Sequence, residues 1–233
     1  TGVGDDVIGI FGDGLKGLGT WTQQYEANNL GTIDFSTSNK ATGIYLNNAT
    51  GENKGILKVN NDSIAFYGQG SGTEIYNSGT IEIGNSSVGL YGNDADIITN
   101  LSGAVIQDTG TVNTGIYNIR TAAGTTAINN NGTVDLGDDG VGIYAEKGSI
   151  TNTGIINVGN KINKNSIGIY AKDSTLNDTG AIKVGDKGIA FYGDSSTLNL
   201  NSSNVDISNN GTLAYGVNNA QINYNLGNKT TSE

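Results

Sequence analysis

Two pairs of adjacent aspartates are the side chains in this sequence whose type and spacing could do chemistry. Asp5-Asp6 and Asp138-Asp139 present carboxylate oxygens, which bind Ca²⁺ and serve as acid and base in glycoside hydrolysis. Calcium-binding β-rolls, however, repeat a glycine-rich nonapeptide with an aspartate in every copy, and this chain has no such repeat. We therefore expect acidic turn residues here, and we predict no metal and no cofactor.

The chain also lacks the residue types that carry most enzyme chemistry. It contains no His and no Cys, so the commonest acid–base group, common metal ligands and the nucleophilic thiol are missing. Its 22 acidic and 12 basic residues fall at different points of the chain and rarely coincide. We expect a protein that is not an enzyme, with a β-helical polysaccharide lyase or glycosidase as the alternative.

The charge balance argues against two classes of partner. The formal net charge is −10, Arg120 is the only arginine, and the lysines are scattered, whereas nucleic-acid binding needs clustered Lys and Arg. The same deficit argues against an anionic membrane surface, and no apolar run approaches the ~20 residues of a membrane-spanning helix. We expect no contact of this chain with nucleic acid or membrane.

Tyrosine recurs at one position of a repeated motif. The motif is clearest in LGDDGVGIYA, Leu136–Ala145, and returns as IGNSSVGLYG, Ile83–Gly92. By alternation along a strand, we expect the aliphatic residues three and one before the tyrosine to point into a core. The tyrosine and the Gly or Ala two before it should then point outward. Eight of the 11 tyrosines occupy this position: Tyr45, Tyr67, Tyr91, Tyr117, Tyr144, Tyr170, Tyr192 and Tyr215.

An aromatic stripe of this kind predicts a binding surface. Tyrosine is favoured at interfaces because its ring is apolar and its hydroxyl is polar. We take Tyr91, Tyr144 and Tyr170 as candidate contact residues for a sugar or a protein. The alternative is that each ring covers its neighbours and shields the backbone.

Short strands must position these tyrosines. A short run with one apolar face, such as TIEI, Thr80–Ile83, follows each glycine of a regular series. A third segment, such as Thr73–Asn77, completes the unit, so one coil is three strands and three turns. The glycines that begin the unit four times lie 24 residues apart: Gly31, Gly55, Gly79 and Gly103.

A unit of about 24 residues with three strands predicts an all-β parallel β-helix solenoid, one segment over residues 1–233. One coil cannot bury its own face, so each depends on its neighbours. Ile, Val and Leu form the core column. Asparagines two before each glycine, such as Asn53, Asn77 and Asn152, are predicted to stack as a hydrogen-bonded ladder along the axis.

Two insertions interrupt the repeat. Residues 13–30 carry the only Trp, Trp21, together with Tyr25, and a smaller loop over residues 118–126 carries Arg120. Functional groups tend to lie on loops held by a rigid scaffold, and these three residue types are enriched at binding hot spots. We predict all three as binding residues, with a tolerated surface loop as the alternative.

The repeats resemble those of a known family. NSGTIEIGNSSVGLYG, Asn77–Gly92, and NNGTVDLGDDGVGIYA, Asn130–Ala145, are similar to passenger-region repeats of fusobacterial type V autotransporter adhesins. The similarity covers roughly residues 31–225. It implies a right-handed β-helix on the extracellular side of a Gram-negative outer membrane, within a longer protein that is anchored by its own C-terminal barrel.

The resemblance also implies a function. We expect a non-enzymatic, monomeric adhesin segment, either stalk or binding region, that attaches to a host-cell or bacterial surface protein or glycan. The absence of Cys agrees with passage through a secretion pore as an unfolded chain. A purely structural spacer is a further alternative.

Overall fold

The computed structural model describes residues 4–14, 26–159, 165–202 and 204–225. These residues form strands and turns, without a helix. It follows that the described part of the chain has no helix of the length and hydropathy needed to cross a bilayer.

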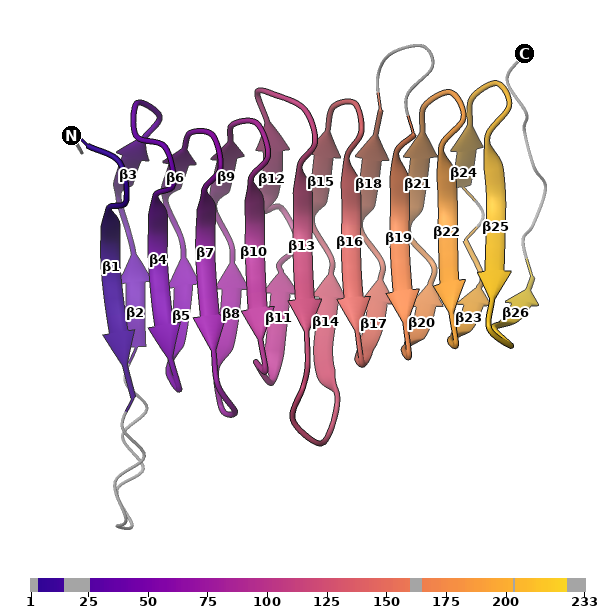
Figure 1. Cartoon of the computed structure of the whole chain (residues 1–233), viewed down its shortest axis with the longest axis horizontal. Helices are drawn as coiled ribbons and strands as arrows, with labels where there is room; N and C mark the ends of the chain where they lie inside the picture. The colour runs from indigo at the N-terminus through magenta and orange to yellow at the C-terminus, as the bar shows by residue number, and fades with distance from the viewer. Residues whose placement is uncertain (1–3, 15–25, 160–164, 203, 226–233) are drawn as a thin grey trace.

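The chain winds as a right-handed coil with three strands per turn (Figure 1). Each strand pairs in parallel with its equivalent one coil later, so consecutive strands lie in different sheets. The described residues contribute nine strands to sheet A, nine to sheet B and eight to sheet C. The predicted β-helix, its three strands per coil and its period of about 24 residues are confirmed.

Sheet A carries the tyrosine motif on six-residue strands. The register places the tyrosine of each coil beside that of the next, as with Tyr67 and Tyr91. In order along the axis its strands are β1 (Ile8–Asp13), β4 (Thr42–Asn47), β7 (Ile64–Gln69), β10 (Val88–Asn93), β13 (Thr114–Ile119), β16 (Val141–Glu146), β19 (Ile167–Lys172), β22 (Ile189–Asp194) and β25 (Thr212–Val217).

Sheets B and C close the coil behind sheet A (Figure 1). Sheet B consists of β2 (Glu26–Asn29), β5 (Thr50–Asn53), β8 (Glu74–Asn77), β11 (Ile97–Asn100), β14 (Thr126–Asn130), β17 (Gly148–Asn152), β20 (Thr175–Asp178), β23 (Thr197–Leu200) and β26 (Gln221–Tyr224). Sheet C consists of β3 (Thr32–Phe35), β6 (Ile56–Val59), β9 (Thr80–Ile83), β12 (Val105–Asp108), β15 (Thr133–Leu136), β18 (Ile155–Val158), β21 (Ala181–Val184) and β24 (Asn204–Ile207).

The core is a column of aliphatic side chains between the three sheets. Leu90 from sheet A, Ile98 from sheet B and Ile106 from sheet C are fully buried and belong to one coil. So few residues cannot exclude water alone, and their burial comes from the coils on either side.

The predicted outward direction of the tyrosine is confirmed. The predicted directions of the residues three and two positions before it are both wrong. In β10, Val88 is half-buried, whereas Gly89 and Leu90 are both buried. The register pairs Val88 with Thr114 and Leu90 with Ile116, so simple alternation is broken between them. A Cβ on Gly89 would lie 2.7 Å from Ile106 Cγ2. The small residue is therefore required inside the coil, and the residue before it faces out.

The turns on either side of sheet A depend on residues with positive φ. Asp6 and Asp139 have φ of 62° and 56° before their strands, and Asn48 and Asp94 have φ of 50° and 59° after theirs. Asn and Asp tolerate this left-handed conformation better than most residues. The aspartate pairs are thus turn residues, as predicted. Among the described residues, no group of three or more His, Cys, Asp or Glu could hold a metal ion.

A ladder of buried amides runs along the axis at the ends of the sheet B strands. Each side-chain Nδ2 donates to the Oδ1 of the next coil over 2.7–2.9 Å. This asparagine ladder confirms the prediction and consists of seven buried residues: Asn29, Asn53, Asn77, Asn100, Asn130, Asn152 and Asp178.

Candidate functional site

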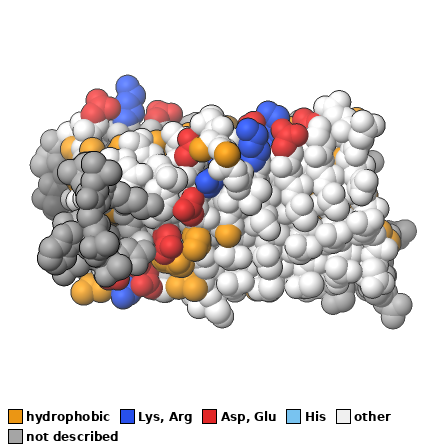
Figure 2. All heavy atoms as spheres, turned by 90° about the horizontal axis from the view of Figure 1, so that it is seen from below, with side chains coloured by type: hydrophobic (Ala, Val, Ile, Leu, Met, Phe, Trp, Pro, Cys, Tyr) orange, Lys and Arg blue, Asp and Glu red, His pale blue; other side chains and the backbone are white. Residues whose placement is uncertain are grey.

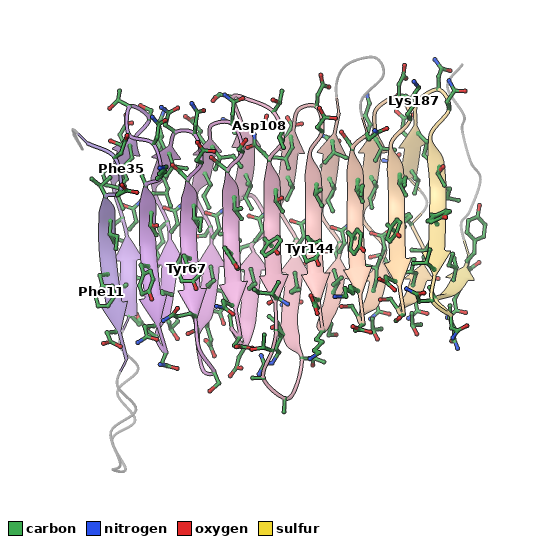
Figure 3. The ribbon with its side chains drawn as sticks, viewed as in Figure 1. Phe11, Phe35, Tyr67, Asp108, Tyr144 and Lys187 are labelled. Atoms are coloured by element: carbon green, nitrogen blue, oxygen red, sulfur yellow. The ribbon has the colours of Figure 1, made fainter. Side chains whose placement is uncertain are left out.

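A continuous row of aromatic rings covers the outer face of sheet A (Figure 3). Neighbouring ring centroids are 4.5–5.4 Å apart from one end to the other. Each strand of sheet A contributes one ring, and parallel strands are ~4.8 Å apart, so neighbouring rings have about the same spacing. We call this row the aromatic ladder, and its members in order are Phe11, Tyr45, Tyr67, Tyr91, Tyr117, Tyr144, Tyr170, Tyr192 and Tyr215.

The rings of the ladder adopt two arrangements. Tyr144 stacks on both neighbours with interplanar angles of 11° and 26°, and Tyr170 stacks on Tyr192 at 13°. Tyr91 lies nearly perpendicular to both of its neighbours, at 84° and 79°. In the stacked part each ring covers the face of the next, so a partner that approaches from outside meets ring edges.

The hydroxyls of Tyr91, Tyr144 and Tyr170 in the ladder stay neutral. Burial is the main cause that raises the pKa of Tyr91, Tyr144 and Tyr170, and neighbouring tyrosines raise it further. The inner rings are half-buried, whereas Phe11 and Tyr215 at the ends are 59% and 50% exposed. The ladder therefore offers an uncharged surface with polar edges.

A second apolar row runs beside the aromatic ladder. The first residue of every sheet A strand faces out, and at each such position the side chain is aliphatic or threonine. Strict alternation predicts that this row lies in the core, and that prediction is wrong. Threonine at several of the positions is the sequence signal of a half-exposed row. Its members are Ile8, Thr42, Ile64, Val88, Thr114, Val141, Ile167, Ile189 and Thr212.

The last residues of the sheet A strands form a mostly polar row on the other side of the aromatic ladder, interrupted by Ile119 and Val217. It includes Asp13, Glu146 and Asp194, and its one lysine, Lys172, lies 3.1 Å from the Glu146 carboxylate. Charged groups at the edge where the sheet A strands end are few and mixed among uncharged side chains (Figure 2). The described outer face of sheet A thus combines an apolar centre with a rim that carries a net negative charge.

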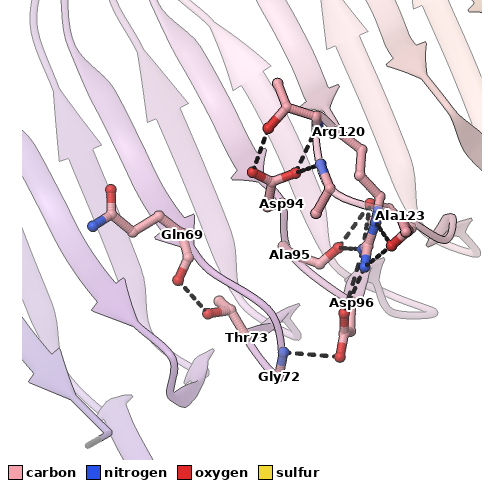
Figure 4. A network of polar contacts seen from close by, with 11 residues as sticks. Gln69, Gly72, Thr73, Asp94, Ala95, Asp96, Arg120 and Ala123 are labelled. Atoms are coloured by element: carbon pink, nitrogen blue, oxygen red, sulfur yellow. Dashed lines mark hydrogen bonds and ion pairs between the residues drawn. The ribbon is translucent and has the colours of Figure 1, made fainter.

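Arg120 lies beneath the loop between β13 and β14, where its donors are used internally (Figure 4). Its Nη1 donates to the Ala95 carbonyl over 2.7 Å, its Nε donates to the Ala123 carbonyl over 3.3 Å, and its guanidinium pairs with the Asp96 carboxylate at 3.3 Å. Only 6% of Arg120 is exposed. We therefore leave Arg120 out of the candidate surface, since its position favours a structural role.

Asp94 holds the other side of the same loop. Its carboxylate accepts hydrogen bonds from the Thr121 and Ala122 backbone N–H groups at 2.7 and 2.8 Å. These bonds lower the pKa of Asp94, the one from Ala122 most strongly. The loop is thus hydrogen-bonded to the preceding coil on both of its sides. Because β13 ends at Ile119 and β14 begins at Thr126, the loop spans residues 120–125, a shorter range than the predicted 118–126.

The remaining predicted binding residues are not placed. Trp21 and Tyr25 lie outside the described residues. Because β1 ends at Asp13 and β2 begins at Glu26, the last part of the predicted insertion, residues 26–30, belongs to the regular coil. Of the predicted site residues, only Tyr91, Tyr144 and Tyr170 come together in one feature.

Comparisons with known proteins identify no family for this chain. No protein-family model, curated protein or solved structure matches it significantly. Its function must therefore be argued from its own surfaces.

Proposed function

We propose that this chain is a non-catalytic adhesive rod that binds a protein on another cell through the outer face of sheet A. The observation that carries the proposal is the largely apolar face, in which the aromatic ladder and the neighbouring row of aliphatic and threonine side chains run side by side over nine strands. Contiguous exposed apolar surface of this extent is typical of interaction sites.

The dimensions of this face fit a stable protein interface. Eight steps of ~4.8 Å give a length of ~38 Å, and six residues of ~3.3 Å give a width of ~20 Å. The product, roughly 760 Å², is close to the ~800 Å² per partner of a standard complex. The acidic rim favours a partner whose own rim is basic.

The ring geometry favours a protein over a glycan. Sugars pack the C–H groups of a pyranose against an exposed ring face. From Tyr117 to Tyr192 those faces are covered by adjacent rings. Ring edges beside a row of aliphatic side chains instead suit the side chains of a flat protein surface, where tyrosine is an enriched contact residue.

An exposed valine on the rim supports the same surface. Val112, in the turn before β13, is 56% exposed and has a φ of 61°. A β-branched residue in this conformation is strained. The equivalent turn positions hold polar residues such as Asp62 and Asp139, so an apolar contact is a reason for valine to stand here.

Display on a cell surface is supported by the repeat resemblance to autotransporter passengers. On that basis we place the chain in a longer type V adhesin, outside the outer membrane of a Gram-negative cell. Its role there is attachment to host or bacterial cells, and we expect the rod to act as a monomer.

The β-helical enzyme is the weaker alternative. Burial raises the pKa of two described carboxyl groups, Asp108 and Asp178, which is a feature that catalytic acids share. They end β12 of sheet C and β20 of sheet B, in different coils, so they do not face one bond of a substrate. The structural spacer remains the outcome if no partner is bound.

The test is binding of the labelled chain to host epithelial cells and to bacterial cells. We expect the double variant Tyr144→Ser/Tyr170→Ser to bind at least about 10-fold more weakly, because central aromatic residues dominate interface energetics. Tyr76→Ser is the matched control, since Tyr76 lies on sheet B and donates to Glu74. Protease treatment of the cells should abolish binding.

Three results would contradict parts of the proposal. If glycosidase rather than protease treatment removes binding, the partner is a glycan. Equal binding by the double variant would exclude the ladder. No binding to any cell would favour a spacer.

A further inference from the structure

The asparagine ladder ends on a carboxyl group. Asp178 Oδ1 accepts the Asn152 amide at 2.7 Å, as each earlier Oδ1 accepts the amide before it. The next coil offers no continuation, because the residue paired with Asp178 is Leu200. Asp178 is fully buried, and its Oδ2 has no hydrogen-bond partner among the described residues. One oxygen at the end of the ladder is therefore left without a bond.

The earlier members of the ladder show what this atom would contact. There the corresponding atom is Nδ2, and in Asn29, Asn53, Asn77 and Asn100 it also donates to the carbonyl of the first residue in a sheet C strand one coil on. Such bonds run from Asn53 to Thr80 over 3.3 Å and from Asn100 to Thr133 over 3.3 Å. Asn130 and Asn152 show the ladder bond without this second bond. The sheet C register carries this position forward to Asn204. By this register, the Asn204 carbonyl occupies the position that accepts from Nδ2 in those four coils, and the Asp178 atom that replaces the amide nitrogen is Oδ2.

We propose that protonation of Asp178 fastens the last described coil, β24 to β26, to the rest of the rod. When the carboxyl group is protonated, its Oδ2–H can donate to the Asn204 carbonyl and reproduce the bond that an asparagine makes. When it is ionised, two oxygens face each other without a hydrogen between them, and a buried charge is left unpaired. The coil then opens more readily.

Among the described residues, no charged group forms an ion pair or a hydrogen bond with the Asp178 carboxyl group that would hold it ionised. Its described partners are the Asn152 amide of β17, Leu200 of β23, which pairs with it, and the Gly180 backbone N–H of the turn that follows. Burial raises the pKa of Asp178 to about 6, against the weaker lowering effects of the Asn152 and Gly180 hydrogen bonds. The protonated form is thus populated in mildly acidic solution.

The last coil is the part of the rod that such a bond can control. Ile222 and Tyr224 of β26 are 39% and 44% exposed, and the described strands of this coil have a neighbour on one side only. Regions with few buried contacts open locally before the whole protein unfolds. In this 233-residue chain, an inter-coil bond at Asn204 therefore acts on strands that described neighbours cover on one side only.

The test is amide hydrogen exchange of the whole chain at pH 5 and pH 7.5. Protection factors of the β24 amides are calculated against the exchange rates of an unstructured peptide at the same pH, which removes the intrinsic pH dependence. A pKa raised from 3.8 to about 6 predicts a local opening constant about 10-fold larger at pH 7.5 than at pH 5. Asp178→Asn supplies a permanent donor and should remove this change.

Two controls keep the proposal falsifiable. Asp108→Asn removes the other carboxyl group whose pKa burial raises, and it should leave the response of β24 unchanged. Equal protection of β24 at both pH values in the unmodified chain would overturn the proposal, and this comparison stands even if Asp178→Asn fails to fold. A pH response that persists in a folded Asp178→Asn variant would also overturn it.

Discussion

The aromatic ladder and the asparagine ladder both place one residue per coil along the axis, yet they lie in opposite environments. Asn77 is fully buried, and its amide is bonded to Asn53 and Asn100. Tyr144 is half-buried, and its ring is stacked between two others on the outer face. Both rows are visible as a repeat in the sequence, so periodicity alone does not separate scaffold from binding surface. Burial does.

The difference assigns a separate task to each row. A buried amide must be hydrogen-bonded because an unsatisfied one is costly, so the asparagine ladder fixes the register of successive coils. Removal of a half-exposed ring costs the protein less stability, and such a ring can contact a partner in place of solvent. We expect variants of the inner row to affect stability, and variants of the outer row to affect binding.

Removal of an inner amide should give the largest loss of stability. Asn77→Ala leaves the Asn53 donor and the Asn100 acceptor without their ladder partner. At 1–3 kcal/mol for each unsatisfied group, the free energy of unfolding should fall by about 3 kcal/mol. Urea denaturation followed by circular dichroism measures it. A loss as small as that of a surface variant would show that the inner ladder does not hold the coils together.

Removal of one outer ring should cost less. Tyr144→Ala removes two stacked contacts, each worth ~0.5–1.5 kcal/mol, so we expect a loss of about 2 kcal/mol. Tyr144→Phe keeps both contacts and should be close to neutral. The same denaturation series checks both. If Tyr144→Ala destabilises as much as Asn77→Ala, the outer row is part of the scaffold.

Acidification should stabilise the rod. Burial raises the pKa of Asp178 to about 6 and that of Asp108 above its ordinary value, so their stabilising effect is fully present below about pH 4 and is lost as the pH rises through the folded values. For Asp178 alone the difference between pH 5 and pH 7.5 is about 1.4 kcal/mol. Asp34 and Asp94, whose pKa values are lowered, act in the opposite direction at lower pH. A higher thermal midpoint at pH 7.5 than at pH 5 would contradict this.

An exposed amide row on sheet B gives the smallest expected effect. Asn199 donates to Asn177 over 2.8 Å and accepts from Asn223 over 2.8 Å. This row lies on the outer surface, and its bonds run in the opposite direction to those of the inner ladder. Water can replace these bonds, so Asn199→Ala should change the free energy of unfolding by less than about 0.5 kcal/mol. Asn199→Ala and Asn77→Ala remove the same kind of bond and differ in burial, so a larger loss of stability in Asn77→Ala would be due to burial. Equal losses in the two variants would contradict this explanation.

The fold could be predicted because its repeat is local and regular. The 24-residue period, the alternating runs and the recurring Asn or Asp before glycine each depend on short-range patterns that stacking then extends. Strict alternation failed at Gly89 and Gly142, because the sheet A strand bends there and turns two consecutive residues inward. A bend of this kind depends on neighbouring coils and leaves only the small side chain as its signal.

The candidate site could be predicted only in part. The repeat predicts the outward position of Tyr144 and its equivalents correctly. It also predicts that the second apolar row beside them lies in the core, which is wrong. The environment of Arg120 is set by Ala95 and Asp96, about 25 residues earlier in the chain. A residue type enriched at binding sites carries no information on whether its donors are already used inside the protein.

Site-specific photo-cross-linking tests most directly which face binds. A benzophenone side chain is introduced in one coil at Val141 of sheet A, at Thr151 of sheet B or at Asp135 of sheet C, and each chain is irradiated on the cells that it binds. Our account predicts a cross-linked cell-surface protein from position 141 alone. Cross-links of equal yield from position 151 or 135, or none from position 141, would contradict it.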